Sequence, residues 1–105
     1  MKSAQEIHEG LARCWSNLAW VVHPEGFRGS DKVLTVTVTF NPIISKWAAR
    51  VKVGGIEVAG LDHSPEVAIM RAYQNMRGAY APVLDTLGKL EEGIFGRWKK
   101  EDSGD

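Results

Sequence analysis

The sequence contains little of several features that mark particular protein classes. Among its 105 residues there is a single cysteine, Cys14, so an internal disulfide is excluded. Thirteen lysines and arginines balance thirteen aspartates and glutamates, so the chain lacks the net positive charge that favours non-specific binding to nucleic acids or anionic membranes. No apolar run approaches the roughly 20 residues of a membrane-spanning helix, and the first ten residues lack the apolar core of a signal peptide. We therefore expect a cytoplasmic protein that does not bind a membrane.

The residues that are present have an ordinary globular composition. Apolar residues make up 44% of the chain and charged residues 25%, as in folded domains rather than disordered segments. A chain of this length has room for one domain with one core. We expect a single domain over residues 1–98, followed by a charged flexible tail over residues 99–105.

The middle of the chain predicts a strand, a tight turn, a second strand and a helix. Apolar and polar residues alternate over Lys46–Val53, as they do in a half-buried strand. The two glycines that follow provide positive-φ positions for a hairpin turn, so Ile56–Gly60 should pair with the preceding strand. Ser64 is then suited to cap a helix, and Pro65 is favoured in the first helical turn.

Patterns on the two sides of this segment predict the remaining elements. Ser3–Val22 carries apolar residues at helical spacing, with Cys14 on the buried side, and Pro24–Asp31 is expected to be an exposed loop. Val33–Phe40 alternates as a strand. The helix that begins at Pro65 should be interrupted at Gly78 and Pro82, and a further helix should run over about 82–98.

These elements predict an α+β fold of the order α-β-β-β-α. Three strands would form an antiparallel meander, covered by helices on one face, with an extra C-terminal helix. One face of each strand is apolar and should point inward. The expected inner face consists of Leu34, Val36, Val38, Phe40, Trp47, Ala49, Val51, Val53, Ile56 and Val58.

The chain from about residue 3 to residue 78 resembles a double-stranded-RNA-binding domain. That family's second strand begins with a lysine and an aromatic residue and ends at a glycine turn, as Lys46 and Trp47 do ahead of the two glycines. The approach to its last helix follows a pattern of small residues at four-residue steps. This pattern is present here as Gly60, Ser64, Ala68 and Ala72. The resemblance implies the family's scaffold.

The residues with which that family binds RNA are absent. Its phosphate-binding lysines would fall on Pro65, Glu66 and Ile69, and isoleucines replace its histidine in the loop Asn41–Ser45. Each missing phosphate contact removes a salt-dependent share of the affinity. The resemblance therefore implies a scaffold that binds duplex RNA weakly or not at all. Because small antitoxin-like domains also end in a capped helix with spaced alanines, an antitoxin-like regulator is a further alternative.

No catalytic motif is present in the sequence. His8, His23 and His63 are not spaced with Cys14 or with carboxylates as metal ligands are, and neither a P-loop nor a nucleophile elbow occurs. Asp62 and His63 form a conceivable acid–base pair, but a solvated loop that caps the next helix accounts for them. We expect no catalytic residues, no enzymatic activity, no cofactor and no metal site.

Two surfaces are candidates for binding a partner. The first is the outer face of the predicted sheet, and the second is the C-terminal helix, which could either pack on its own domain as additional core or expose its apolar stripe to a partner. On the sheet the candidate residues are Thr35, Thr37, Thr39, Lys46, Arg50 and Lys52. On the helix they are Leu87, Leu90, Ile94, Phe95 and Trp98.

The leading hypothesis is a non-catalytic protein-interaction module that binds an unidentified protein partner and forms a homodimer. By analogy alone, such small neutral domains are frequent among phage and mobile-element accessory proteins, including inhibitors of bacterial defence complexes such as anti-CRISPR proteins. The alternative is a weak nucleic-acid-binding protein that uses the basic outer face together with Arg28 and Lys32. A third alternative is an enzyme that uses His63.

Overall fold

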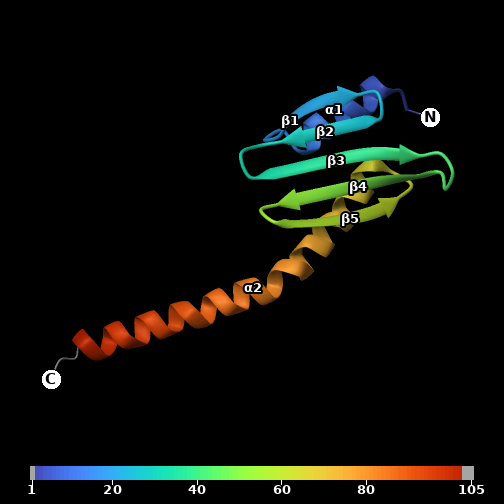
Figure 1. Ribbon diagram of the computed structural model, residues 1–105. Helices are drawn as coiled ribbons and strands as arrows, with labels where there is room; N and C mark the ends of the chain where they lie inside the picture. Colours follow the sequence, from blue (N-terminus) through green and yellow to red (C-terminus); the bar gives the residue numbers. More distant parts are fainter. Residues whose placement is uncertain (1, 103–105) are drawn as a thin grey trace.

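The computed structural model describes the backbone of residues 2–102 and the side chains of residues 2–96. Over this range the chain forms an N-terminal helix, a five-stranded sheet and a long C-terminal helix (Figure 1). Its extents of 71 × 25 × 19 Å reflect the length of that second helix. The elements are α1 (Ala4–Cys14), β1 (Ala19–His23), β2 (Gly26–Ser30), β3 (Leu34–Asn41), β4 (Lys46–Val53), β5 (Ile56–Asp62) and α2 (Pro65–Asp102).

The sheet is an antiparallel meander in which each strand pairs with the next along the chain. The predicted α+β class is confirmed, and the three predicted strands correspond to β3, β4 and β5. Within the described residues the sheet has five strands, however, so the expectation of three was wrong. The turn between β4 and β5 uses a positive φ at Gly54 (+60°), whereas Gly55 does not have the positive φ that was predicted for it.

The two additional strands replace the predicted second half of the first helix and the predicted loop Pro24–Asp31. The run Trp20-Val21-Val22 favours a strand because aromatic and β-branched side chains fit a pleated surface. A turn at residues 24–25 then pairs Val22 with Phe27. Gly29 appeared to indicate a loop, yet a Cβ there would lie only 2.7 Å from the ring of Trp20. This glycine is therefore needed for packing between β1 and β2.

The end of α1 also differs from the prediction for Cys14. Ile7 and Leu11 are buried as the apolar stripe predicted, but Cys14 is exposed, so its predicted place on the buried side was wrong. The helix ends there, and the next turn brings Trp15 and Trp20 together, with the Trp20 indole donating a 3.0 Å hydrogen bond to the Trp15 carbonyl. The rings of Trp15 and Trp20, rather than the Cys14 thiol, therefore pack against the core at this end of α1.

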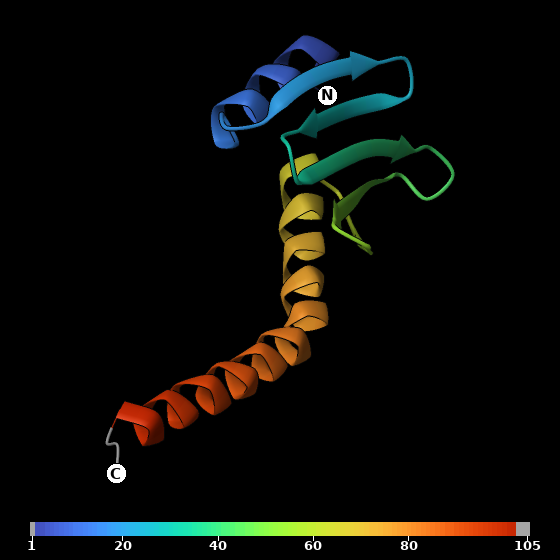
Figure 2. The same ribbon diagram turned by 60° about the vertical axis from the view of Figure 1, so that its left-hand side comes forward.

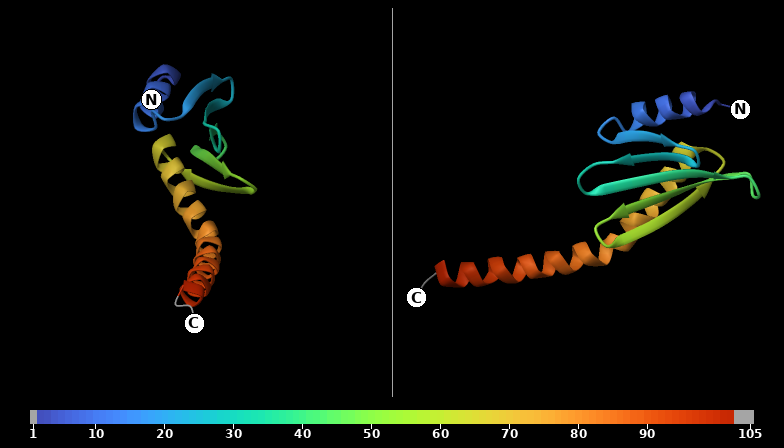
Figure 3. Two further views of the ribbon diagram at one scale, coloured as in Figure 1. Left: turned by 90° about the vertical axis from the view of Figure 1, so that its left-hand side faces the viewer. Right: turned by 45° about the horizontal axis from the view of Figure 1, so that its top comes forward.

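Both helices lie on the same face of the sheet (Figures 2 and 3). The predicted inner face is confirmed, since Val36, Val38, Ala49 and Val51 are all buried and the other predicted members are half-buried. Trp47 contributes aromatic packing to this face through Phe27 and Phe40, as the strand pattern predicted. The buried core consists of Ile7, Leu11, Leu18, Phe27, Val36, Val38, Ala49, Val51, Ala68, Ile69, Ala72 and Met76.

Small residues allow α2 to lie directly against β5. Ser64 caps the helix by accepting a 3.1 Å hydrogen bond from the Val67 amide. Ala68 and Ala72 are fully buried, and a Cβ on Gly60 would lie 2.5 Å from the Ala68 carbonyl oxygen and 2.5 Å from the Ala72 amide nitrogen. The glycine, serine and alanine spacing thus has a packing role in this fold.

α2 continues from Pro65 to Asp102, so the predicted interruption at Gly78 and Pro82 was wrong. Pro82 lies inside the helix, where it cannot donate an amide to the carbonyl of Gly78, and its ring crowds the preceding turn. The consequence is a bend rather than a break, visible in Figure 2. The Thr86 hydroxyl donates a 2.9 Å hydrogen bond to the Pro82 carbonyl just beyond the bend. Residues 103–105 of the predicted tail lie outside the described residues.

Candidate interaction surfaces

Several exposed apolar side chains lie on the part of α2 beyond Tyr80, which we call the distal arm (residues 81–102). It projects away from the sheet (Figure 1). Of the two alternatives for this segment, packing on its own domain was therefore wrong, and the exposed stripe is observed. The exposed fractions, which range from 42% to 63%, belong to Val83, Leu84, Leu87, Leu90, Ile94 and Phe95. The side chain of Trp98 lies outside the described residues.

The apolar face of the distal arm continues the face of α2 that covers the sheet. Ile69, Met76, Val83 and Leu90 follow one another at intervals of seven residues, which places them on one side of a helix. In the first half of α2 this side is covered, and Ile69 and Met76 are only 5% and 7% exposed. In the distal arm the equivalent side chains are open to solvent. The arm therefore has the pattern of a buried helix face without a sheet beneath it.

A second apolar feature, which we call the apolar hollow, lies between the end of α1 and the first half of α2. Its volume is about 430 Å³. The donor group of Trp20 is directed to the Trp15 carbonyl, so its ring contributes apolar surface. Met70 and Tyr73 belong to the lining and are more than half exposed. The hollow is lined by Trp15, Leu18, Trp20, Leu34, Val36, Val51, Val53, Ile69, Met70, Tyr73 and Met76.

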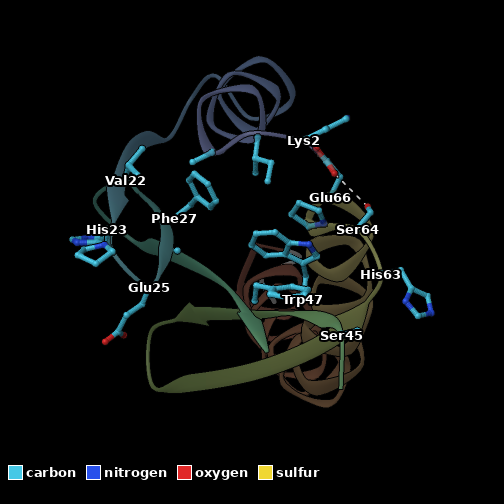
Figure 4. A pocket seen from close by; sticks show the side chains of 16 residues that line it. Lys2, Val22, His23, Glu25, Phe27, Ser45, Trp47, His63, Ser64 and Glu66 are labelled. Carbon is cyan, nitrogen blue, oxygen red and sulfur yellow. Dashed lines mark hydrogen bonds between the residues drawn. The ribbon is translucent and has the colours of Figure 1, made fainter. Parts of the chain in front are cut away.

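A wider cleft of about 680 Å³ opens between the start of α1 and the start of α2 (Figure 4). Phe27 and Trp47 point into it, with ring centroids 6.2 Å apart. Ser64 and Glu66 stand at one side, where the Ser64 hydroxyl donates a 3.3 Å hydrogen bond to the Glu66 carboxylate, and His63 points away. The cleft thus has an aromatic floor, with Glu66 and Lys2 on one side and Glu25 on another.

The loop proposed for acid–base chemistry is occupied by structural contacts. One carboxylate oxygen of Asp62 accepts a 2.7 Å hydrogen bond from the His63 backbone amide, and the other accepts one of 2.7 Å from Arg71. The Arg71 hydrogen bond, followed by that of the amide, lowers the pKa of Asp62 below its usual value of 3.8. In the part of the chain that the structure describes, no group of three histidine, cysteine, aspartate or glutamate side chains could hold a metal ion.

The outer face of the sheet collects the predicted polar residues. Strand register places Arg28, Thr37 and Arg50 side by side on β2, β3 and β4, and Thr35 beside Lys52. Arg50 and Glu57 form an exposed ion pair of 3.8 Å, which contributes little to stability. Thr39 and Lys46 lie on the same face, towards the other end of β3 and β4. We call Arg28, Arg50 and Lys52 the cationic row. Arg28 had been assigned to a loop, so its place in this row follows only from recognising β2.

The structure does not join the two predicted surfaces, because the distal arm extends beyond the sheet (Figure 3), whereas strand register places the predicted polar residues on the outer face of the sheet. Sequence reasoning also missed Met70, Tyr73 and the hollow beside them. The sequence analysis considered only the alanine-spaced side of this helix, and no local pattern indicated that Met70 and Tyr73 would border a hollow.

Comparison with known proteins adds no family to this description. No family model, no curated protein and no solved structure matches the chain. None of the helices in the described range has both the length and the apolar character required to span a membrane.

Proposed function

We propose that this protein is a non-catalytic interaction module that docks onto protein through the distal arm. The observation that carries the proposal is the exposed apolar face of α2 beyond Tyr80. Leu84 and Leu90 are 63% and 61% exposed, and both lie on the part of α2 that has left the sheet. Contiguous apolar surface of this kind is rare on monomers and marks contacts with other molecules.

The form of the surface indicates how a partner would bind. An amphipathic helix is recognised through apolar side chains three, four and seven residues apart, which enter a groove or pair with another helix. Leu87, Leu90 and Ile94 have these spacings. The partner should therefore be helical or grooved, and the contact should depend on apolar burial more than on salt.

A pair of neighbouring substitutions tests the proposal. Leu90→Glu places a charge in the apolar face, whereas Lys89→Glu introduces the same side chain about 100° around the helix, outside that face. Affinity capture with quantitative mass spectrometry and sedimentation velocity should show associations that Leu90→Glu removes and Lys89→Glu retains. If both variants and the unmodified protein give identical captured proteins and identical monomeric sedimentation, the arm is not a docking surface.

The cationic row on the outer face favours nucleic-acid binding as a second candidate. Arg28 and Arg50 flank Thr37, and Lys52 lies one row away, so phosphate groups could be bound along the sheet. We expect such binding to be weak, because Glu57 lies among these cations. A gel shift at low salt should then weaken with added salt and on Arg50→Glu. Absence of a shift at micromolar protein would rule this candidate out.

The narrower hypothesis of a phage or mobile-element inhibitor of a bacterial defence complex would use the same distal arm. It stays a prediction, and so does the antitoxin-like alternative. Purified defence complexes provide a direct assay, in which inhibition should be lost on Leu90→Glu and kept on Lys89→Glu.

A further inference from the structure

The exposed flank of α2 that borders the apolar hollow has a self-complementary sequence. Met70 and Tyr73 lie on it in the first half of the helix, and Leu84 follows near the bend. Arg77 and Glu91, both exposed, lie on the same flank at seven residues before and seven residues after Leu84. A spacing of seven residues returns to the same side of a helix.

Two such flanks match when the helices run antiparallel. If a twofold axis passes beside Leu84, a residue that precedes Leu84 by a given number of positions faces the residue of the second copy that follows Leu84 by the same number. Leu84 then meets its own copy, and Arg77 meets Glu91 of the second copy, which gives two oppositely charged pairs. Tyr73 meets residue 95 of the second copy, a phenylalanine, so an aromatic side chain lies opposite an aromatic one. If the two helices ran parallel, Arg77 would instead lie opposite Arg77 of the second copy, and Glu91 opposite Glu91.

The same arrangement accounts for the apolar hollow. A twofold axis perpendicular to α2 keeps the sheet-facing sides of both helices turned in the same direction. The distal arm of one copy then lies beside the first half of α2 of the other, on the flank that carries Met70 and Tyr73. Its apolar face, with Leu87, Leu90 and Ile94, points towards the sheet at the hollow. The arm's own sheet is out of reach, because α2 is continuous and leads away from it (Figure 1).

The chemistry of the hollow also favours an apolar helix over a small ligand. Small-molecule sites generally combine apolar walls with a few polar groups that orient the ligand. The polar groups among the residues that line this hollow are the Tyr73 hydroxyl and the indole N–H groups of Trp15 and Trp20, and the Trp20 N–H already donates to the Trp15 carbonyl. A twofold dimer would fill two hollows with two arms, so every apolar contact is made twice.

We infer that the protein forms a twofold homodimer in which the α2 helices pair antiparallel about Leu84 and each distal arm fills the apolar hollow of the other copy. This inference rests on the proposed function, since it assigns a second copy of the chain as the occupant of the arm. The Arg77 to Glu91 contact fixes the register, and apolar burial supplies the driving force.

Charge reversal tests the register with the full chain. Arg77→Glu and Glu91→Arg should each raise the dimer dissociation constant roughly tenfold in sedimentation velocity, because each places like charges at both contacts. An equimolar mixture of the two variants should recover the dimer, since every contact in the mixed dimer is again oppositely charged. The double variant should recover it as well. Lys89→Glu, on the opposite side of the arm, is the matched control and should leave dimerisation unchanged.

The seating of the arm is tested by cross-linking to the native thiol. Cys14 is exposed at the end of α1 beside Trp15, which lines the hollow. Gly93 lies on the arm's flank away from Arg77 and Glu91, and a Cβ there has nothing within 4 Å. A Cys14→Ser/Gly93→Cys chain mixed with the unmodified chain should form a heterologous cross-link with a short bis-maleimide. A Cys14→Ser/Asp85→Cys chain should not.

The outcomes separate this inference from the proposed function. A dimer that survives both single charge reversals, or that lacks the cross-link, overturns the antiparallel seating but leaves the arm as a docking surface. A monomer at all concentrations overturns the inference. In that case the proposed function stands only if Leu90→Glu removes a captured protein. Recovery by mixing, together with the cross-link, supports the inference.

Discussion

The Tyr80 hydroxyl donates a 2.6 Å hydrogen bond to the backbone carbonyl of Val53, and so ties α2 to the end of β4 just before the helix leaves the sheet. The ring packs against the core. Val53 precedes Gly54, whose positive φ turns the chain into β5, so the same contact supports the β4 to β5 turn. This contact marks the boundary between the covered half of α2 and the distal arm.

Replacing this tyrosine should weaken the junction. Tyr80→Phe removes the hydroxyl and leaves the Val53 carbonyl without that donor, at a cost of about 1 kcal/mol. For a domain of this size the melting temperature should fall by roughly 4–8 °C. Calorimetry or thermal circular dichroism provides the measurement. Tyr73→Phe is the control, because the Tyr73 side chain is more than half exposed and its loss of a hydroxyl should change little.

The close approach of β5 and α2 predicts a much larger effect at Gly60. Gly60→Val would put side-chain atoms into the Ala68 carbonyl and the Ala72 amide, both 2.5 Å from the Cβ position, and Ala72→Trp would crowd the same junction. Overpacking of this kind costs roughly 1–3 kcal/mol or more, so we expect a loss of cooperative unfolding or a strongly lowered denaturant midpoint.

Gly78 gives the matched comparison for that experiment. A Cβ on Gly78 has nothing within 4 Å, and the residue lies inside α2. Gly78→Ala should therefore stabilise the helix by up to about 1 kcal/mol. If Gly60→Val melts like the unmodified protein, the strand and helix junction is not where the structure places it.

Local sequence patterns predicted β3, β4 and the start of α2 correctly, because each pattern there is compatible with only one kind of element. Strict alternation in β3 and β4 and the glycine, serine and alanine spacing before and within α2 left little choice of face or cap. The N-terminal third could not be predicted in the same way. Trp15, Leu18 and Val22 lie at helical spacing, yet Leu18 is buried from a turn and Val22 belongs to β1. Gly29 suggests a loop until Trp20 is seen against it.

The candidate site was predicted in its residues but not in its surroundings. The apolar stripe of the distal arm follows from helical spacing alone. Whether such a stripe is covered depends on where the helix points, and Pro82 was expected to end the helix when it only bends it. The apolar hollow depends on Trp15, Trp20 and Met70, which come from three elements. A packing relationship between distant segments leaves no local pattern.

The loop before α2 predicts a dependence on acid. The Arg71 hydrogen bond lowers the pKa of Asp62 in the folded protein, so its contribution to stability is present above the unfolded value of 3.8 and is lost as the pH falls further through the folded value. The melting temperature should accordingly decline below about pH 4. Arg71→Gln should raise the pKa of Asp62 and reduce this acid-dependent loss, as followed by carboxyl NMR titration.

Asp31 is the internal control for that titration. Backbone amides of Leu34 and Val33, each 2.7 Å from one carboxylate oxygen, lower the pKa of Asp31 without any arginine. Arg71→Gln should leave the titration midpoint of Asp31 unchanged. An equal shift of both aspartates would mean that the substitution perturbs the whole domain rather than the Asp62 contact.

The bend in α2 predicts an effect of proline removal that is confined to the helix. Pro82→Ala restores an amide that can donate to the Gly78 carbonyl and removes the ring from the preceding turn, a change of up to about 3 kcal/mol in local helix stability. Hydrogen exchange of amides in residues 83–90 should slow, while amides in β3 and β4 keep their rates. Gly88→Ala is the control, since it favours the helix by about 1 kcal/mol without touching the bend. Slower exchange in Gly88→Ala than in Pro82→Ala would mean that the proline does not strain α2.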